Sequence, residues 1–269
     1  MTEPIVEQLE IEWAAIAALA ATFTDDEWEL PTALPGWTVR DNVSHVIGIE
    51  RMLLGDAAPE VDVSHIARIA HDPFGASIES WVEARRSVPG PEVAAELDTV
   101  IERRRDQLAA MTDEDFARVG FSPIGEVPYR RFMQVRVFDC WMHEQDMRRA
   151  VGREGHLDGS AVDVALDHFT TALGFVVGKK AGAPQGSSVV FDVDGPTHRR
   201  YGVVVDGRAQ LVDPAPDDPT VTISLPLTSF VALGGGRWDV AEARAAGGLE
   251  VTGDSELGER VLANLGFTP

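Results

Sequence analysis

The chain has 269 residues, of which 44% are hydrophobic and 25% are charged, so it has the composition of a globular protein with a sizeable core. Its formal net charge of −21 repels phosphate backbones, and we therefore expect no nucleic-acid partner. A single cysteine excludes an internal disulfide. An acidic start and the lack of a long uninterrupted apolar stretch favour a cytoplasmic protein that does not enter membranes.

Apolar residues three or four positions apart predict helices in the first half of the chain. The expected helices cover residues 4–23, 38–54, 78–86, 91–111 and 130–151. The second begins with Thr38-Val39-Arg40-Asp41, a capping box in which the threonine and aspartate side chains bind free backbone amides. Gly55 and Gly152 are expected to end the second and fifth helices.

The pattern changes at the polar stretch Gly152-Arg153-Glu154-Gly155, so we predict two domains, residues 1–155 and 156–269. The second domain is predicted to contain helices at 160–179, 227–233 and 257–265, and strands at 188–193, 201–205, 210–212, 220–224 and 249–252. Asp206-Gly207 indicates a hairpin between two of these strands. The sequence thus predicts an α+β protein, a helical bundle followed by a smaller domain with helices on a mostly antiparallel sheet.

One acid and two histidines are the strongest candidates for a metal site. Asp139 and His143 are four residues apart, which places them on one face of a predicted helix. His45 lies in an apolar stretch of the helix at 38–54, and the two helices can meet in an antiparallel bundle. Three such ligands leave a fourth position open, as in catalytic zinc sites. The alternative is a set of hydrogen-bonded polar groups, with Asp139 paired to Arg136 or Arg148.

We expect plain surface or core roles for the remaining histidines. His65 and His71 lie in a predicted loop and His156 lies in the linker between the domains, whereas His168 and His198 have no acid or histidine at ligand spacing.

Several residues close to the candidate ligands in sequence have expected roles of their own. Asp146 falls on the same helix face and could orient a ligand histidine. Glu144 and Cys140 are each turned about 100° from a candidate ligand, so we expect Glu144 at the surface and Cys140 as a buried, inert thiol. Trp37, just before the Thr38 cap, is expected to act as a hydrophobic staple.

Three segments carry a resemblance to a known family. LPGWTVRDNVSHVIGIERMLLG, residues 34–55, resembles the signature helix of the mycothiol-dependent maleylpyruvate isomerase family, a branch of the DinB-like four-helix bundles. RVFDCWMHEQDMRRAVGR, residues 136–153, resembles that family's later metal-binding helix. The stretch from LTSFVALGGGRWD to the end looks like the family's C-terminal domain, which is similar to sterol-carrier folds. The resemblance implies zinc ligands at His45, Asp139 and His143, with Asp139 where the family has glutamate.

The resemblance also implies an activity. The thiol mycothiol would bind at the open zinc position as a thiolate and react with a small electrophilic substrate, in an isomerase or a transferase.

Only two of the 23 basic residues are lysine, which is typical of a GC-rich, actinobacterial genome. Arg237, after three glycines, is our candidate catalytic residue for binding an anionic group, although a solvated arginine after a helix cap is the plain alternative.

Two other functions fit the same sequence. The protein could be a non-enzymatic binding protein whose second domain holds an apolar ligand, in a cavity lined by Phe169, Leu173, Phe175, Val176 and Phe230; a filled core explains these residues equally well. It could also be a metal-dependent hydrolase, in which the metal activates water instead of a thiol.

Overall fold

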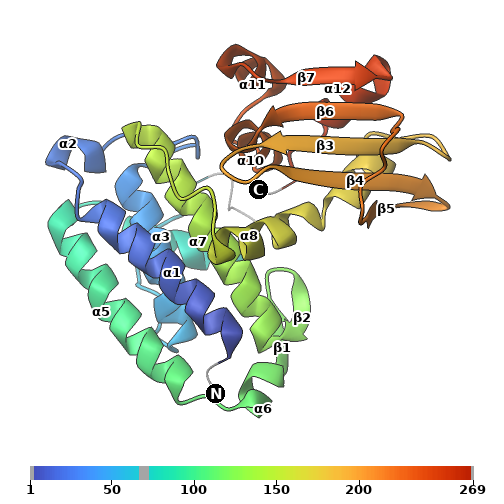
Figure 1. Ribbon diagram of the computed structural model, residues 1–269. Helices are drawn as coiled ribbons and strands as arrows, with labels where there is room; N and C mark the ends of the chain where they lie inside the picture. The colour runs from blue at the N-terminus through green and yellow to red at the C-terminus, as the bar shows by residue number, and fades with distance from the viewer. Residues whose placement is uncertain (1–2, 67–72, 268–269) are drawn as a thin grey trace. The chain divides into compact units, whose positions relative to one another are not determined.

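The computed structural model describes residues 3–66 and 73–267 (Figure 1). The chain divides into two compact units, Met1–His156 and Leu157–Pro269. The first is mostly helical, and the second combines helices with a sheet. The predicted α+β class, with a helical bundle followed by a smaller α+β part, is confirmed.

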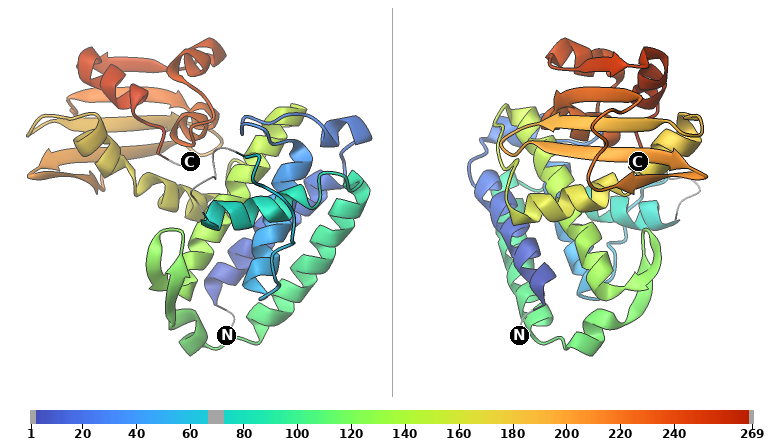
Figure 2. Two further views of the ribbon diagram at one scale, coloured as in Figure 1. Left: turned by 180° about the vertical axis from the view of Figure 1, so that it is seen from behind. Right: turned by 45° about the vertical axis from the view of Figure 1, so that its right-hand side comes forward.

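Four long helices form the bundle of the first unit: α1 (Pro4–Ala20), α3 (Val39–Leu53), α5 (Gly90–Ala109) and α7 (Tyr129–Val151). Helix α1 packs on α5 and α7, and α3 packs on the same two helices, so the four close into a ring around one core (Figures 1 and 2). Trp13, Val43, Leu97 and Val137, one from each helix, are fully buried in that core. The bundle therefore places residues of α3 against residues of α7.

The ends of α3 and α7 agree with the predicted caps. Thr38 Oγ1 accepts a hydrogen bond from the Asp41 amide, and Asp41 Oδ2 accepts one from the Thr38 amide at 2.9 Å. Gly55 and Gly152 both have positive φ angles, of 85° and 66°, which glycine adopts without steric cost. These caps fix where the two helices begin and end, and so which residues face the core.

Several short elements of the first unit were not predicted. They are α2 (Asp25–Trp28), α6 (Asp113–Ala117), and a hairpin of β1 (Val119–Ser122) and β2 (Gly125–Pro128). Both short helices begin with capping boxes, at Thr24 and Thr112. Helix α4 (Pro73–Glu83) covers more of the loop than the predicted 78–86 and ends before Arg86. The unpredicted elements, α2, α6 and the β1–β2 hairpin, are too short to show a helical or strand period in the sequence.

The second unit contains a five-stranded sheet in the order β5-β4-β3-β6-β7. Its strands are β3 (Ser188–Asp194), β4 (Arg199–Asp206), β5 (Arg208–Val212), β6 (Val221–Pro226) and β7 (Glu250–Gly253). Only β3 and β6 run parallel, which confirms a mostly antiparallel sheet. Asp206 pairs with Arg208 across Gly207, so the predicted hairpin is confirmed. Helices α10 (Leu227–Gly234), α11 (Val240–Ala246) and α12 (Ser255–Ala263) complete the unit, and α11 was not predicted.

The helix predicted at 160–179 is confirmed in extent, but it is not a continuous α-helix. Helix α8 (Ser160–Thr170) is followed by the short α9 (Leu173–Phe175) and a π-helical turn at Val176–Lys180. Gly174 and Gly178 lie so close to Ala209 of β5 that a β-carbon at either position would come within 2.9 Å of it. Helix α9 and the π-helical turn therefore pack closely against β5.

The apolar residues of this segment were also proposed to line a cavity for an apolar ligand, in the alternative of a non-enzymatic binding protein. Phe169, Leu173, Val176 and Phe230 are fully buried, and the rings of Phe169 and Phe230 lie 5.1 Å apart, as in a filled core. Phe175 is 59% exposed and lines no part of that core. Among the described residues, the stretch at 160–180 is the one helical segment long and apolar enough to cross a membrane, and half of it is buried inside the protein.

Candidate metal centre

The three predicted metal ligands lie together in the first unit. His45 comes from α3, and Asp139 and His143 come from consecutive turns of α7. One possible ligand atom of each lies within 4.8 Å of the other two. His45 Nε2 is 3.2 Å from Asp139 Oδ2, and His143 Nε2 is 3.7 Å from Asp139 Oδ1. The aspartate, although shorter than glutamate, thus presents one oxygen to each imidazole.

Burial and charge put two of these groups in the protonation states that metals require. Burial lowers the pKa of His45 to about 4 and outweighs the opposing effect of Asp139, so the imidazole is neutral at neutral pH. Burial alone would raise the pKa of Asp139, but Arg136 and His45 hold it well below its usual value. Neutral imidazole and ionised carboxylate are the forms that bind divalent metals. The Asp139 side chain keeps 29% of its surface exposed, which leaves the cluster accessible from that side.

The tautomer of His143 follows from its contact with Asn42. The Asn42 amide nitrogen donates to Thr38 O at 2.9 Å and to Thr32 Oγ1 at 3.3 Å, so the amide oxygen points the other way. That oxygen lies 2.8 Å from His143 Nδ1, which must therefore carry the proton. This leaves His143 Nε2, the ring nitrogen nearer to Asp139, as the atom that can bind a metal. Second partners of this kind orient the histidines of metal sites.

Asn42 has the role that the sequence suggested for Asp146, which is to orient a ligand histidine. Asp146 Oδ2 lies farther from His143 Nδ1, at 3.8 Å, and Asp146 forms an ion pair with Arg149 at 3.3 Å. Asn42 was missed because its contact with His143 forms only when α3 packs against α7. Its position three residues before His45 on one helix face was the available signal.

A buried ionic network adjoins Asp139. Arg136 donates hydrogen bonds to Asp139 Oδ2 and to Glu50 Oε1, the latter at 2.7 Å, so the pairing of Asp139 with Arg136 given by the non-metal alternative does occur. Arg104 donates to the other Glu50 oxygen at 2.7 Å. Two carboxylates and two guanidinium groups cancel in charge. The network therefore anchors Arg136 and contributes no net charge to the cluster.

Trp37 forms an aromatic wall beside the two histidines. Its ring centroid lies 5.3 Å from that of His45 and 5.7 Å from that of His143, in a stacked arrangement with the latter. Its indole nitrogen donates to Glu79 Oε1 at 2.9 Å. The predicted staple is wrong, since the helix position that it would contact holds the polar Asn42. Among the described residues, His45 Nδ1 has no hydrogen-bond partner, so the His45 ring is oriented by its packing and by the contact of Nε2 with Asp139.

Two predictions about neighbouring residues of α7 have opposite outcomes. Cys140 is buried, and burial raises the pKa of its thiol well above the usual value, which confirms an inert thiol. Glu144 is wholly buried, so the predicted surface role is wrong. It forms an ion pair with Arg148 and contacts His156. The helix face that carries Glu144 is covered by α1 and by the segment after Gly152, which the spacing of residues along α7 could not reveal.

The other sequence candidates lie away from the cluster or in the second unit. His65 is exposed and 3.9 Å from Glu83, whereas His71 lies outside the described residues. Arg237, in the second unit, donates to Gly235 O at 2.6 Å. Its catalytic role stays a prediction.

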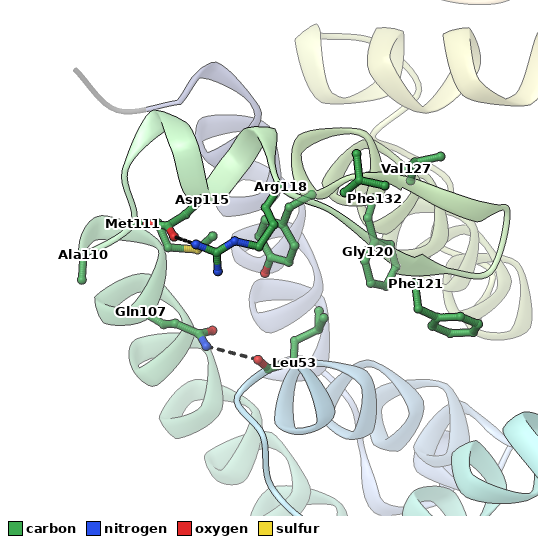
Figure 3. A pocket seen from close by; sticks show the side chains of 12 residues that line it. Leu53, Gln107, Ala110, Met111, Asp115, Arg118, Gly120, Phe121, Val127 and Phe132 are labelled. Atoms are coloured by element: carbon green, nitrogen blue, oxygen red, sulfur yellow. Dashed lines mark hydrogen bonds and ion pairs between the residues drawn. The ribbon is translucent and has the colours of Figure 1, made fainter.

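A cavity of about 420 Å³ lies elsewhere in the first unit, near the β1–β2 hairpin (Figure 3). Its lining is mainly apolar and comes from α3, α5, α7 and the hairpin, with residues that include Leu53, Gln107, Met111, Phe121, Val127 and Phe132. None of His45, Asp139 or His143 lines it. The cavity is thus separate from the candidate metal centre.

Two uncharacterized proteins of Mycobacterium tuberculosis, from strains CDC 1551 and H37Rv, are each 23% identical to this chain over 149 residues. These matches cover 55% of this chain, which spans little more than half, 57%, of the relatives' length.

Solved structures share the fold at low sequence identity. Crystal structures of the mycothiol-dependent maleylpyruvate isomerase and of a histidine-to-alanine mutant of that enzyme match with TM-scores of 0.53 and 0.57. The identities are 17% and 16%, and each match covers 94% of this chain and 95% of the other. Sterol Carrier Protein 2 Like 2 from Aedes aegypti reaches a TM-score of only 0.31, at 16% identity, over 38% of this chain and 96% of that protein, so the second unit is assigned by its family instead.

Family models cover both units. The mycothiol maleylpyruvate isomerase N-terminal domain matches residues 9–148, just over half of the chain, and the C-terminal domain of the same family matches residues 163–260. The chain therefore belongs to the mycothiol maleylpyruvate isomerase family.

Proposed function

We propose that this protein is a zinc-dependent enzyme of the mycothiol-dependent maleylpyruvate isomerase type, with His45, Asp139 and His143 as the zinc ligands. The observation that carries the proposal is the convergence of these three side chains from two helices, with ligand atoms within 4.8 Å of one another. Family membership supports mycothiol as the thiol and a small electrophile as its reaction partner.

The donor set fits the ion. Two imidazoles and one carboxylate are ligands that zinc prefers, and three of them leave a position open. The low pKa values of His45 and Asp139 remove the need to displace protons from these two ligands at neutral pH. Asn42 holds the His143 ring so that Nε2 is free to bind. When bound, the metal would lower the pKa of a coordinated thiol and so supply a thiolate nucleophile at neutral pH.

Charge around the cluster favours an anionic ligand. Asp139 and Glu50 are balanced by Arg104 and Arg136, so a divalent cation at the cluster leaves an excess of positive charge. A thiolate, or the carboxylate of a small substrate, would compensate for that charge. Trp37 covers the two histidines on one side and limits the access of water there.

Titration calorimetry with mycothiol tests the proposal. Wild-type protein loaded with zinc should bind mycothiol, whereas protein stripped with EDTA should not. His143→Ala should lose both one zinc equivalent and mycothiol binding. His198→Ala, which removes an exposed histidine of the second unit, should retain both. Mycothiol binding that is unchanged in His143→Ala would reject the proposed site.

Activity measurements separate the remaining alternatives. With mycothiol and maleylpyruvate, the proposed enzyme isomerises or conjugates the substrate only when zinc and thiol are both present. A metal-dependent hydrolase would instead act on its substrate without thiol. A non-enzymatic binding protein would show neither the thiol-dependent reaction nor hydrolysis. The catalytic role of Arg237 and the cytoplasmic location stay predictions, and Arg237→Gln is expected to raise the KM for an anionic substrate.

A further inference from the structure

A second group of metal-ligand side chains lies in the first unit, apart from the residues considered so far. It consists of Glu12 from α1, Glu144 from α7, and His156, which follows α7. One possible ligand atom of each lies within 4.8 Å of the other two. His156 Nδ1 is 2.6 Å from Glu144 Oε2, and His156 Nε2 is 3.9 Å from Glu12 Oε1. The cluster joins the N-terminal helix of the bundle to the end of its last helix.

Glu12 is the unexplained member of this cluster. Both glutamates are wholly buried, and the His156 side chain is 16% exposed. Within the described part of the chain, neither oxygen of an ionised Glu12 receives a hydrogen bond, and the Glu144 carboxylate repels the ionised form and hydrogen-bonds with the protonated one. An ionised carboxylate buried in this way is costly unless a positive charge compensates for it. In the folded protein, Glu12 therefore needs either a proton or a bound cation.

The charge of the cluster depends on its protonation. Arg148 donates to Glu144 Oε1 at 2.7 Å and balances that carboxylate. For an ionised Glu12, the other group of the cluster that could carry a positive charge is His156, whose Nε2 lies 3.9 Å from Glu12 Oε1. Without a bound cation, burial and the neighbouring Glu144 raise the pKa of Glu12 to about 9, so its carboxyl group keeps a proton at neutral pH.

The fold holds His156 in place for this contact. The residue has a φ of 53°, in the left-handed region that few residues other than glycine adopt. Its carbonyl oxygen accepts hydrogen bonds from Trp141 Nε1 at 2.9 Å and Gln145 Nε2 at 3.3 Å, both from α7. Buried side chains of the bundle thus fix the backbone from which the imidazole reaches the two glutamates.

We propose that Glu12, Glu144 and His156 form a second site for a divalent cation of the zinc class. An imidazole with two carboxylates suits zinc better than magnesium or calcium, which prefer oxygen ligands alone. The cation would supply the charge that Glu12 lacks and would link α1 to α7. The site shares no residue with the cluster of His45, Asp139 and His143, so the two sites can be tested separately.

Zinc stoichiometry of the full-length chain tests this proposal. Protein stripped with EDTA is titrated with zinc chloride, and retained metal is measured after desalting by mass spectrometry. Wild type should retain about two equivalents, and Glu12→Gln and His156→Ala about one each, because each variant removes one ligand. Glu7→Gln, a matched change at an exposed position of α1, should retain both.

Circular dichroism establishes whether each variant is folded. If Glu12→Gln does not fold, His156→Ala serves as the test variant, because His156 lies outside the helices of the bundle. The variant His143→Ala separates the two sites. Loss of one equivalent in His143→Ala and of another in Glu12→Gln supports both sites. If His143→Ala retains all the zinc while Glu12→Gln loses metal, the second site stands and the proposed function fails. A wild type with one equivalent, which Glu12→Gln and His156→Ala both keep, would overturn the second site and assign a proton to Glu12.

Discussion

Replacing Glu50 with glutamine should strongly destabilise the first unit, because this carboxylate neutralises two buried guanidinium groups. Glu50 and Arg104 are wholly buried and Arg136 is 3% exposed. Each arginine donates to one Glu50 oxygen at 2.7 Å. Burial alone would raise the pKa of Glu50, but the two arginines lower it below its usual value, so the group is ionised at neutral pH.

The magnitude follows from what the substitution leaves behind. Glutamine has almost the same shape as glutamate and can still accept hydrogen bonds, so the change removes charge without opening a cavity. Removing one partner of a buried ion pair costs about 3–5 kcal/mol, and here two guanidinium groups lose their partner. We expect a loss near the top of that range, of about 4–5 kcal/mol. A typical domain has about 5–15 kcal/mol of stability, so the variant would be close to unfolding.

Urea unfolding followed by tryptophan fluorescence measures this loss. Five of the six tryptophans lie in Met1–His156, so the signal reports mainly on the first unit. The control Glu102→Gln removes the same charge from an exposed position of α5 and should change the free energy of unfolding by less than about 0.5 kcal/mol. A loss below about 1 kcal/mol in Glu50→Gln would refute the account of a tightly coupled network.

Three further predictions follow from the same structure. Asn42→Leu should weaken zinc binding about 10- to 100-fold, because the histidine it orients loses its second partner, and equal affinities by calorimetry would contradict this role. In EDTA, the stability of wild type relative to Glu12→Gln should fall as pH rises from 4.5 toward 9, by up to about 1.4 kcal/mol per pH unit. The sign follows because the folded protein keeps a proton that the unfolded chain has released; parallel stability curves would disprove it. Gly48→Ala places a β-carbon 2.4 Å from Trp81 Cβ and should cost about 1–3 kcal/mol in urea unfolding, whereas Gly120→Ala, with open space around it, should be nearly neutral.

The sequence was sufficient for the long helices, because their apolar periods extend over several turns and their caps are local signals. Thr38 and Gly152 mark helix ends wherever the helices pack. The helix at 160–179 was predicted as continuous, whereas the turn at residues 171–172 and the π-helical turn after α9 have no signal in the apolar pattern. Short elements such as α2 and the β1–β2 hairpin likewise lack a period.

For the candidate metal centre too, some residues could be predicted from the sequence and others could not. Asp139 and His143 are neighbours on one helix, so their spacing is visible in the sequence, and His45 lies on a second predicted helix that the family resemblance also marks. Trp37 and Asn42 join the site only through packing of α3 and its preceding turn against α7. Glu12, Glu144 and His156 come from separate elements, and the sequence placed the last two at the surface or in a linker. A buried cluster of this kind is a property of the tertiary structure alone.

The most direct test of the central claim is a crystal structure of the zinc-loaded protein, with anomalous diffraction measured on both sides of the zinc absorption edge. The account predicts an anomalous peak at bonding distance, about 2.0–2.2 Å, from a ring nitrogen of His45 and of His143 and from a carboxylate oxygen of Asp139. No peak between these three residues, with Arg136 still paired to Asp139, would contradict it.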